Sequence, residues 1–390
     1  KLRRKLYDHT RYCRKIEYLG WQEKYRFWAW ANGISTIEGD FLPVDEYGIV
    51  EYKKQTYFIA PLSLITIEDD KAFRDEKKFI YVKRNDVSFE QWCKLFTTVH
   101  GHQSMISVAF YLTSVFSDFI FHYLDNLPLL NIFGVKGTGK NEQAYSLLSL
   151  FGKPQNELQV HNATKAGIAA HLEMFINSIA WMDEYKDSVE PDIVESLKGI
   201  YNRNGRTKGK KTGGKETVPV NSMGLVTGQE MLTKDIALFS RVLFLSYFDT
   251  NRTQTAVNKF NELKEFQKKG LSQLTHELIM LRPVIEESYS ATFRDVQADL
   301  ANTTGQQLIE DRLIKNYATI LATFKLVSHH IHFSFTYESL FRIAREHMVN
   351  HNDHMATNNE IFQFFNMLET LVERRLILED ENFKIKTVSY

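Results

Sequence analysis

The sequence has little cysteine and no excess charge of either sign. Its 390 residues include two cysteines, Cys13 and Cys93, which cannot form a disulfide framework and do not show the Cys-x-x-Cys spacing of a zinc ribbon. Lys and Arg together number 48, as do Asp and Glu, which excludes a generally cationic nucleic-acid coat protein. These absences favour a protein of a reducing compartment, and we expect a cytoplasmic location.

The sequence also lacks an uninterrupted apolar run that would cross a membrane. Residues 105–130 are rich in Phe, Leu, Ile and Val, but Ser114, Asp118 and Asp125 interrupt them and Pro128 closes the stretch. A buried helix followed by a strand explains this pattern better than a membrane span does. Repeats, low-complexity tracts and proline-rich linkers are absent too, so the sequence predicts a globular protein without a membrane partner.

Residues 131–142 carry the most specific pattern, an apolar strand that leads into a glycine-rich turn. Such a turn directs backbone N–H groups toward a chain of phosphates, and the helix expected over residues 142–151 adds its positive N-terminal end. Lys140 is spaced to reach the β- and γ-phosphates of a nucleoside triphosphate. The residues predicted to bind the nucleotide are Gly134, Gly137, Thr138, Gly139, Lys140, Asn141 and Glu142.

Asn141 departs from the pattern Gly-x-x-x-x-Gly-Lys-[Ser/Thr]. A hydroxyl at this position ligates Mg²⁺, and an amide oxygen is a weak substitute for it. Two hypotheses stay open at this point. In one, Asn141 and a downstream carboxylate hold the metal and ATP is hydrolysed; in the other, the chain binds nucleotide and DNA but has lost hydrolysis.

A second half of a nucleotide site follows downstream. Residues 179–184, Ile-Ala-Trp-Met-Asp-Glu, form an apolar strand that ends in paired acids, as a Walker B element does. Asp183 is predicted to hold Mg²⁺ and Glu184 to polarise the attacking water. Solvated acids after a buried strand are the plainer interpretation, but the phosphate-binding turn upstream favours the functional one.

Residues 203–215 contain six basic residues, four glycines and no acid. Their flanks, residues 199–201 and 216–220, are predicted to pair as the strands of a β-hairpin with a cationic tip. Such a tip contacts phosphates without reading bases. A solvated loop is the alternative, and the predicted DNA-binding residues are Arg206, Lys208, Lys210, Lys211 and Lys215.

Two further strands follow the hairpin. The apolar strand over residues 223–227 leads into Thr227-Gly228-Gln229-Glu230, which is the form of a sensor 1 strand. Thr227 or Gln229 is the predicted sensor, and Asn221 is a nearby alternative. Arg241 then leads into residues 242–245, another apolar strand. An arginine in this position can act across a subunit boundary on the γ-phosphate of a neighbour's ATP.

The order GVKGTGKNE, IAWMDEYKD, Lys-rich hairpin, GLVTGQE and FSRVLFL resembles superfamily 3 and related MCM-like AAA+ helicases, specifically the helicase/primase proteins of bacterial mobile elements and phages. The segments HGHQSM, residues 100–105, and LGWQEKYRFWAWANGI, residues 19–34, resemble the parts of those proteins that precede the ATPase core. The resemblance implies ATP and Mg²⁺ as cofactors and a hexameric ring of identical chains. It also implies single-stranded or forked DNA in the central channel, and a primase or loader as a partner.

Carried onto this sequence, the resemblance assigns roles to single residues. It makes Lys140 the Walker A lysine, Asp183 and Glu184 the Walker B pair, Thr227 or Gln229 the sensor 1 group, Arg241 the arginine finger, and Lys208, Lys210 and Lys211 the hairpin lysines. The expected activity is ATP hydrolysis coupled to DNA unwinding. A duplex translocase and an ATP-driven switch without nucleic acid remain alternatives beside the assembly that has lost hydrolysis.

The expected fold class is α/β, with an AAA+ P-loop NTPase core. We predict a β-rich N-terminal domain over residues 1–87, a helical collar segment over 88–127, the ATPase core over 128–250 and a helical region over 251–390. A helix near residues 358–374 and two short strands over 376–386 suggest a winged-helix-like end; because its turn is acidic, a protein-contact or capping domain is an equal alternative. A chain that opens on Lys1 and a basic run fits a piece of a longer polypeptide.

Three histidines on one side of a predicted helix, His347, His351 and His354, suggest a metal surface. Asp353 is the nearby carboxylate, and no cysteine completes a ligand set. We therefore expect a solvated helix face at these positions.

Overall fold

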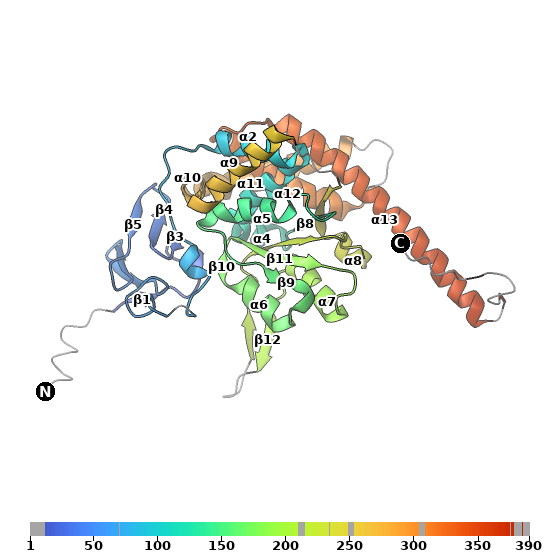
Figure 1. The fold of residues 1–390 in the computed structure, drawn as a ribbon, viewed down its shortest axis with the longest axis horizontal. Helices are drawn as coiled ribbons and strands as arrows, with labels where there is room; N and C mark the ends of the chain where they lie inside the picture. The colour runs from blue at the N-terminus through green and yellow to red at the C-terminus, as the bar shows by residue number, and fades with distance from the viewer. Residues whose placement is uncertain are drawn as a thin grey trace.

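The computed structural model of the protein describes residues 12–69, 71–209, 215–233, 235–248, 253–303, 309–374, 376–377 and 384. Along the chain, short N-terminal strands are followed by a central parallel sheet and then by long helices. In Figure 1 the N-terminal strands lie to one side of the central sheet, a hairpin projects below it, and helix α13 extends away from the body. The mixed α/β character expected from the sequence is confirmed.

The N-terminal strands pack around aromatic side chains. The first sheet contains β2 (Leu19–Gln22), β3 (Phe27–Trp30), β4 (Gly33–Thr36) and β5 (Phe41–Pro43), and the second contains β1 (Arg14–Lys15), β6 (Ile49–Tyr52) and β7 (Gln55–Phe58). Successive side chains of a strand point to opposite faces. Phe27 meets Tyr57 edge-to-face and Trp28 stacks with Phe79, so both faces of β3 are covered and all four of its residues are buried.

Polar and backbone contacts join these strands to the rest of the chain. The strand β10 (Phe175–Ile176) pairs in parallel with β2, and a side chain at Gly20 would meet the carbonyl oxygen of Ile176 at 1.9 Å, so the pairing requires glycine there. Arg26 forms two hydrogen bonds of 2.6 and 2.7 Å with Glu286. The N-terminal sheet is thereby attached to both the core and the C-terminal helices.

The central sheet contains five parallel strands in the order β15-β8-β14-β11-β9. Their bounds are β8 (Leu129–Gly134), β9 (Leu158–Gln159), β11 (Ile179–Tyr185), β14 (Met223–Gly228) and β15 (Val242–Tyr247). After β8 the chain crosses to the far edge at β9, returns through β11 and β14, and then passes β8 to add β15 on its other side. The order reverses at β8, and ligands of open α/β sheets bind outside the carboxyl ends of strands at such a point.

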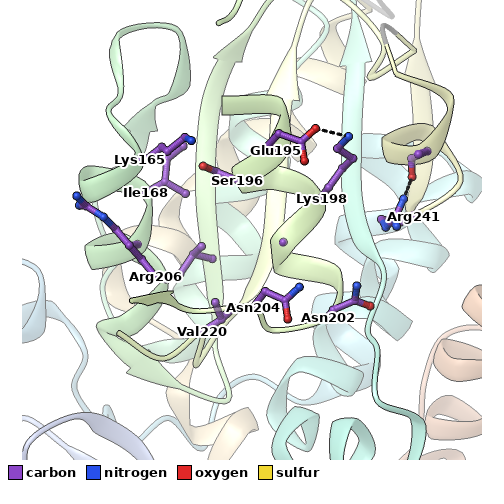
Figure 2. Close-up of a pocket in the computed structure, with 14 residues that line it drawn as sticks. Lys165, Ile168, Glu195, Ser196, Lys198, Asn202, Asn204, Arg206, Val220 and Arg241 are labelled. Atoms are coloured by element: carbon purple, nitrogen blue, oxygen red, sulfur yellow. Dashed lines mark hydrogen bonds and ion pairs between the residues drawn. The ribbon is translucent and has the colours of Figure 1, made fainter. Parts of the chain in front are cut away.

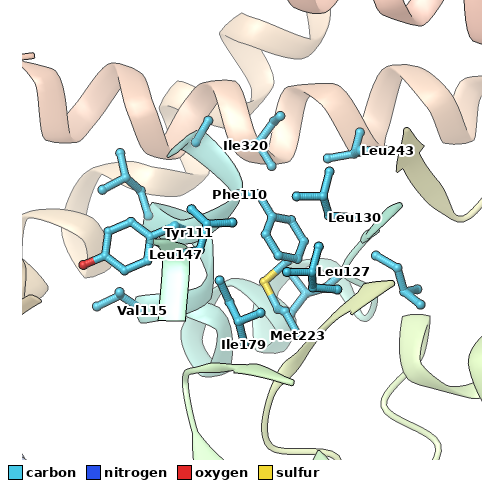
Figure 3. Close-up of a cluster of buried hydrophobic side chains, with 14 of the residues drawn as sticks. Phe110, Tyr111, Val115, Leu127, Leu130, Leu147, Ile179, Met223, Leu243 and Ile320 are labelled. Atoms are coloured by element: carbon cyan, nitrogen blue, oxygen red, sulfur yellow. The ribbon is translucent and has the colours of Figure 1, made fainter. Parts of the chain in front are cut away.

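The strands of this sheet are apolar along their length because helices cover both faces of the sheet. Figure 3 shows Phe110 of α3 (Met105–Val115) among side chains of the sheet, with Leu130 from β8 and Leu243 from β15 nearby. Ile320 of α12 (Asp311–Ser328) faces the same cluster. These four side chains are fully buried, and because Leu243 pairs with Leu130 the cluster covers one face of the strand that leads into the glycine-rich turn.

Helices provide most of the remaining structure. Their bounds are α2 (Phe89–His100), α4 (Ser117–Leu124), α5 (Lys140–Leu148), α6 (Lys165–Glu173), α7 (Pro191–Tyr201), α8 (Ile236–Phe239), α9 (Gln254–Lys269), α10 (Ser272–Ile279), α11 (Arg282–Thr303) and α13 (Tyr337–Glu373), with 3₁₀ turns η1 (Glu76–Lys78), η2 (His102–Ser104), η3 (Ser149–Phe151) and η4 (Val160–Asn162). Within the described part of the chain, no single helix is long and apolar enough to cross a membrane. The pair His102–Val115 and Ser117–Leu124 passes that test together but bends by 87° at its break.

The C-terminal end differs from the sequence-based expectation. The helix predicted near residues 358–374 is the last part of α13, which begins at Tyr337 with Thr336 as its N-cap. The turn and second strand of the predicted winged end, residues 378–383 and 385–386, lie outside the described residues. The division of the chain into four domains stays a prediction.

The histidine face of α13 is not solvated at its centre. His351 is fully buried, and its ring lies 4.3 Å from that of Phe239 and 5.0 Å from that of Phe244. Its Nε2 lies 3.1 Å from the carbonyl oxygen of Phe239, so Nε2 carries the proton and donates it. The expected solvated face is therefore wrong for His351, because α13 packs against α8 and β15. Among the described residues, no group of three or more His, Cys, Asp or Glu side chains is arranged to hold a metal ion.

We expect the protein to lose stability in acid through His351. Burial lowers the pKa of its imidazole from 6.5 to about 3. The unfolded chain therefore binds the proton below pH 6.5 while the folded chain does not, and stability is lost as the pH falls from about 6.5 toward 3. His351→Gln keeps a donor for the Phe239 carbonyl but does not titrate. In urea titrations, the free energy of unfolding of the variant should fall by about 2 kcal/mol less than that of the parent between pH 6.5 and 4.5.

The exposed His330 provides the matched control. His330→Gln should reproduce the parental pH dependence in the same urea titrations. An equal pH slope in His351→Gln and the parent would contradict the prediction.

Candidate functional site

The glycine-rich turn connects β8 to α5 at the carboxyl end of the central sheet. Gly137 and Gly139 have φ angles of 86° and 87°, in the left-handed region that favours glycine. A side chain at Gly134 would meet the carbonyl oxygen of Tyr247 at 1.8 Å, so the close approach of β15 requires glycine at this position. The turn ends at Gly139, the N-cap of α5, whose free N–H groups and dipole make an anion site.

Lys140 lies inside the turn that it was predicted to serve. It is 8% exposed, and its Nζ donates hydrogen bonds to the carbonyl oxygens of Gly134 (2.8 Å) and Val135 (2.7 Å). Burial lowers the pKa of the Lys140 ammonium, while Asp183 opposes that shift. A triphosphate in the turn would offer anionic acceptors in place of two neutral carbonyls, which adds the attraction between opposite charges to the hydrogen bonds of the ammonium.

Asp183 at the end of β11 is held by two side chains. Asn141 Nδ2 donates to one carboxylate oxygen at 2.7 Å, and the hydroxyl of Thr227 donates to the other at 2.5 Å. The Thr227 oxygen in turn accepts from Trp181 Nε1 at 2.8 Å. The structure thus brings Asn141 and Asp183 together from two different elements, as a shared metal site would require.

Glu184 follows directly and has an unusual backbone. Its φ angle is 58°, and the pairing of β11 with β14 is irregular between Met182 and Tyr185. Such a bulge turns the side chain that sits on it out of the sheet, and bulges are common beside active sites. As a result Asp183 is buried while the neighbouring Glu184 is exposed.

These residues line one cavity of about 360 Å³. Its wall includes Lys140, Asn141, Asp183, Glu184 and Gln229, together with Lys136, Gly137, Gly139, Glu142, Tyr185, Lys186 and Gly228. The carboxylates of Asp183 and Glu184 fit Mg²⁺, which takes one or two carboxylates and shares its other positions with water and phosphate oxygens. Of the two predicted sensors, Gln229 reaches this cavity, whereas Thr227 is fully buried under Asp183.

The rival sensor Asn221 lies away from the cavity. It precedes β14, whose carboxyl end carries Gln229, and its amide donates to the carbonyl oxygen of Glu173 at 2.7 Å. Asn221 is thus at the opposite end of the strand, and the structure gives it no contact with the glycine-rich turn.

A second cavity of about 540 Å³ lies on the other side of the turn and shares Gly137 and Gly139 with the first. Phe248, Val257 and Phe260 contribute apolar surface to it. His100 is buried in its wall, and burial lowers the pKa of this imidazole to about 3, so the ring is neutral. A cavity with both apolar and polar lining that adjoins a phosphate site has the character of a pocket for a nucleotide base. His100 belongs to the segment HGHQSM that carried the resemblance, whereas the sequence did not point to Phe248, which follows β15, or to Val257 and Phe260 of α9.

Arg241 lies at the other end of the sheet. It precedes β15, in which Val242 pairs with Leu129 at the start of β8 and Tyr247 pairs with Gly134 at its end. Five residues of strand span roughly 16 Å, so Arg241 cannot reach the phosphate turn of its own chain. Its guanidinium donates to the carbonyl oxygen of Ala237 and lies 5.7 Å from the ring of Tyr201.

Figure 2 shows Arg241 at the edge of a cavity that it shares with Lys165, Lys198 and Arg206. Lys198 pairs there with Glu195 at 2.5 Å and with Asp235 at 2.9 Å. The cavity measures about 460 Å³ and is bounded by α6, α7 and the base of the hairpin. It is therefore separate from the phosphate cavity, and Lys165, Lys198, Arg206 and Arg241 outnumber Glu195 in its lining.

The predicted hairpin is present. β12 (Arg206–Gly209) and β13 (Lys215–Val218) are antiparallel, with Lys208 opposite Glu216. The predicted first flank, residues 199–201, is wrong, because these residues complete α7 and the strand starts at Arg206. Arg206 is exposed, Lys208 and Lys215 lie on the strands, and Lys210 and Lys211 lie outside the described residues. The hairpin projects from the body below the central sheet (Figure 1).

No family description and no curated protein matches the chain. Among solved structures, the chain is similar to SCCmec type IV Cch, an active helicase, with a TM-score of 0.58 and 14% identity over 99% of this chain and 69% of that one. JCV helicase matches with a TM-score of 0.34 and 11% identity over 61% of this chain and 72% of that one. The NrS-1 C-terminal region matches with a TM-score of 0.26 and 14% identity over 73% and 75%.

The Cch similarity extends over nearly the whole chain, including the N-terminal strands and the C-terminal helices. At this level of identity the similarity concerns the fold. The chain shares the fold of the Cch helicase structure, and the resemblance seen in the sequence agrees with that fold. The roles of the individual site residues stay predictions.

Proposed function

We propose that this chain is an ATP-dependent DNA helicase or translocase that works as a ring of identical copies, a hexamer by its resemblance. The observation that supports this most is the separation of two halves of one site. Lys140, Asp183 and Glu184 share a cavity at the carboxyl end of the sheet, while Arg241 faces outward at the amino end. A head-to-tail contact between copies would join the two halves, and contacts of this type generate rings.

In the proposed reaction each residue has a distinct task. Lys140 leaves the carbonyls of its turn and donates to the terminal phosphates, and the N–H groups at the start of α5 bind the remaining oxygens. Asp183 and Asn141 would hold Mg²⁺, which would neutralise charge on the phosphates. Glu184 orients and deprotonates the attacking water, and Gln229 lies within the same cavity to sense the terminal phosphate. Arg241 of the neighbouring copy stabilises the transition state.

The hairpin is the proposed contact with DNA. Arg206 is exposed at the start of β12, Lys208 and Lys215 lie on the two strands, and Lys210 and Lys211 come between the strands in the sequence. Lysines contact phosphates without selecting a sequence, as movement along a strand requires. Single-stranded or forked DNA is the proposed substrate. Replication of a phage or mobile element in the cytoplasm, with a primase or loader as partner, is part of the same proposal.

Steady-state ATP hydrolysis with Mg²⁺, with and without single-stranded DNA, tests the function. We expect DNA to stimulate hydrolysis in the parent, and replacement of Lys208, Lys210 and Lys211 by alanine to remove the stimulation while the DNA-free rate is kept. Forked-duplex unwinding should fall in parallel. DNA-stimulated hydrolysis without unwinding would favour a duplex translocase, and unchanged activities in the triple variant would favour a switch that does not use nucleic acid.

A second candidate function is a nucleotide-dependent DNA-binding assembly that has lost hydrolysis. The hydrogen bond of 2.7 Å from Asn141 to Asp183 favours it, because the amide points a donor, not an oxygen, at the carboxylate that would hold the metal. Asn141→Ser distinguishes the candidates. Hydrolysis in both the parent and the variant supports the helicase, whereas hydrolysis in the variant alone supports the assembly.

A further inference from the structure

We propose that Arg312 on α12 acts together with Arg241 as a second cation that binds the nucleotide phosphates of the neighbouring copy. This inference rests on the proposed function, since it concerns the same site between two copies. It assigns a role to a helix outside every motif of the sequence. Arg312 is separated from Arg241 by much of the C-terminal region and becomes its neighbour only in the folded chain.

The two guanidinium groups line one open cavity of about 570 Å³. Lys315 lines it as a third cation, and Asp311 is the carboxylate of the lining, which also includes Asn126, Tyr201, Asn202 and Gln297. A cavity with three cations and one carboxylate favours an anionic ligand. Its floor contains the ring of Tyr201, over which Arg241 lies.

Ser240 fixes Arg312 beside Arg241. The Arg312 Nη1 donates to the hydroxyl oxygen of Ser240 at 2.5 Å, and Ser240 directly precedes Arg241 in the chain. Asn316, one turn further along α12, donates to the carbonyl oxygen of Ser240 at 3.0 Å and accepts from the hydroxyl of Tyr201 at 3.0 Å. The backbone before Arg241 is thus held by α12, so one helix positions both arginines.

The pair is only partly neutralised within the chain. Arg312 is 38% exposed and lies 3.5 Å from Glu310, a loose contact for an ion pair at the surface. Arg241 donates to a neutral carbonyl, and no carboxylate pairs with it among the ion pairs of the described residues. Burial lowers the pKa of Arg241, and the positive charge of Arg312 lowers it further. Two like charges held together cost free energy, which a phosphate from outside would recover.

Lys315 is a weaker candidate for the same task. Its Nζ donates to the carbonyl oxygen of Leu124 at 2.8 Å, and burial lowers the pKa of this ammonium. Lys165 and Lys198, in the adjacent cavity, already pair with Asp192 and with Glu195 and Asp235. Arg312 is therefore the cation best placed to extend the reach of Arg241.

Mixing experiments with three variants test the proposal. Lys140→Ala removes the phosphate lysine, Arg241→Ala removes the proposed finger, and Arg312→Gln removes the charge while a donor for Ser240 remains. Each variant alone should hydrolyse ATP slowly, with a loss of about 100-fold for Arg312→Gln. In a random mixture of Lys140→Ala with Arg312→Gln, about a quarter of the interfaces are complete, and hydrolysis should recover accordingly. A mixture of Arg241→Ala with Arg312→Gln should not recover, because no copy presents both arginines.

The mixtures separate failure of this inference from failure of the proposed function. If Lys140→Ala with Arg241→Ala recovers but Arg312→Gln alone keeps the parental rate, the role of Arg312 is overturned and the proposed function stands. Recovery in the Arg241→Ala and Arg312→Gln mixture would also overturn it, since that result places Arg312 at the site of its own chain. Absence of recovery in the Lys140→Ala and Arg241→Ala mixture contradicts the proposed function, and the inference with it.

Two further variants exclude a loss of folding. Arg312→Lys restores a cation and should recover part of the rate of Arg312→Gln, whereas a purely structural role would give no such rescue. Arg342→Ala removes an exposed arginine whose partner Glu346 lies 3.9 Å away, and it should keep the parental rate and the parental oligomeric state. Thermal unfolding of all variants checks that each one is folded.

Discussion

Arg241→Ala is expected to lower the rate of ATP hydrolysis by about 10³-fold or more, while the isolated chain keeps its affinity for ATP. The size of the effect is that of an arginine that stabilises phosphoryl transfer from a neighbouring molecule, and 10³-fold corresponds to about 4 kcal/mol of transition-state stabilisation. ATP affinity is preserved because roughly 16 Å of strand β15 separates Arg241 from the glycine-rich turn of its own chain.

The measurement combines kcat at saturating ATP with nucleotide binding at protein concentrations too low for assembly. Arg342→Ala serves as the matched control and should change neither quantity. Arg241→Lys should recover little of the rate, because an ammonium cannot bind two phosphate oxygens through a planar fork. A loss of ATP affinity in the dissociated Arg241→Ala chain would show that Arg241 acts within its own chain.

Glu184→Gln is expected to lower kcat by about 10² to 10⁴-fold and to leave ATP binding intact. The amide keeps the size of the side chain and its position on the bulge of β11, but it cannot accept the proton of the attacking water. Asp183, Asn141 and Thr227 remain hydrogen-bonded to one another in this variant, so the proposed metal site is preserved. The variant should accumulate as an ATP-bound assembly on DNA.

Glu265→Gln is the matched control for this substitution. Glu265 is an exposed acid on α9 that pairs with Lys268, and its replacement should leave both kcat and binding at parental values. Parental hydrolysis in Glu184→Gln would remove Glu184 from the reaction. It would favour instead an assembly in which the nucleotide is bound and not turned over.

Local patterns carried much of the prediction. The glycines of the turn, the apolar strands that end in Asp183 and Thr227, and the hairpin follow from short-range rules about backbone freedom and strand alternation. The same rules gave wrong predictions where contacts between distant segments determine the conformation or the burial of a residue. The hairpin flank at residues 199–201 became the end of α7, and His351, on what looked like a polar helix face, is buried against Phe239.

The sequence by itself determined the chemistry that each segment can supply: a phosphate-binding turn, a pair of acids and a cationic hairpin, in an order that resembles helicases. Only the tertiary structure decided which groups meet. It linked Asn141 and Thr227 to Asp183, put Gln229 in the phosphate cavity, and set Arg312 beside Arg241. The physical reason is that parallel strands gather their carboxyl ends at one edge of the sheet and their amino ends at the other, whatever their separation along the chain.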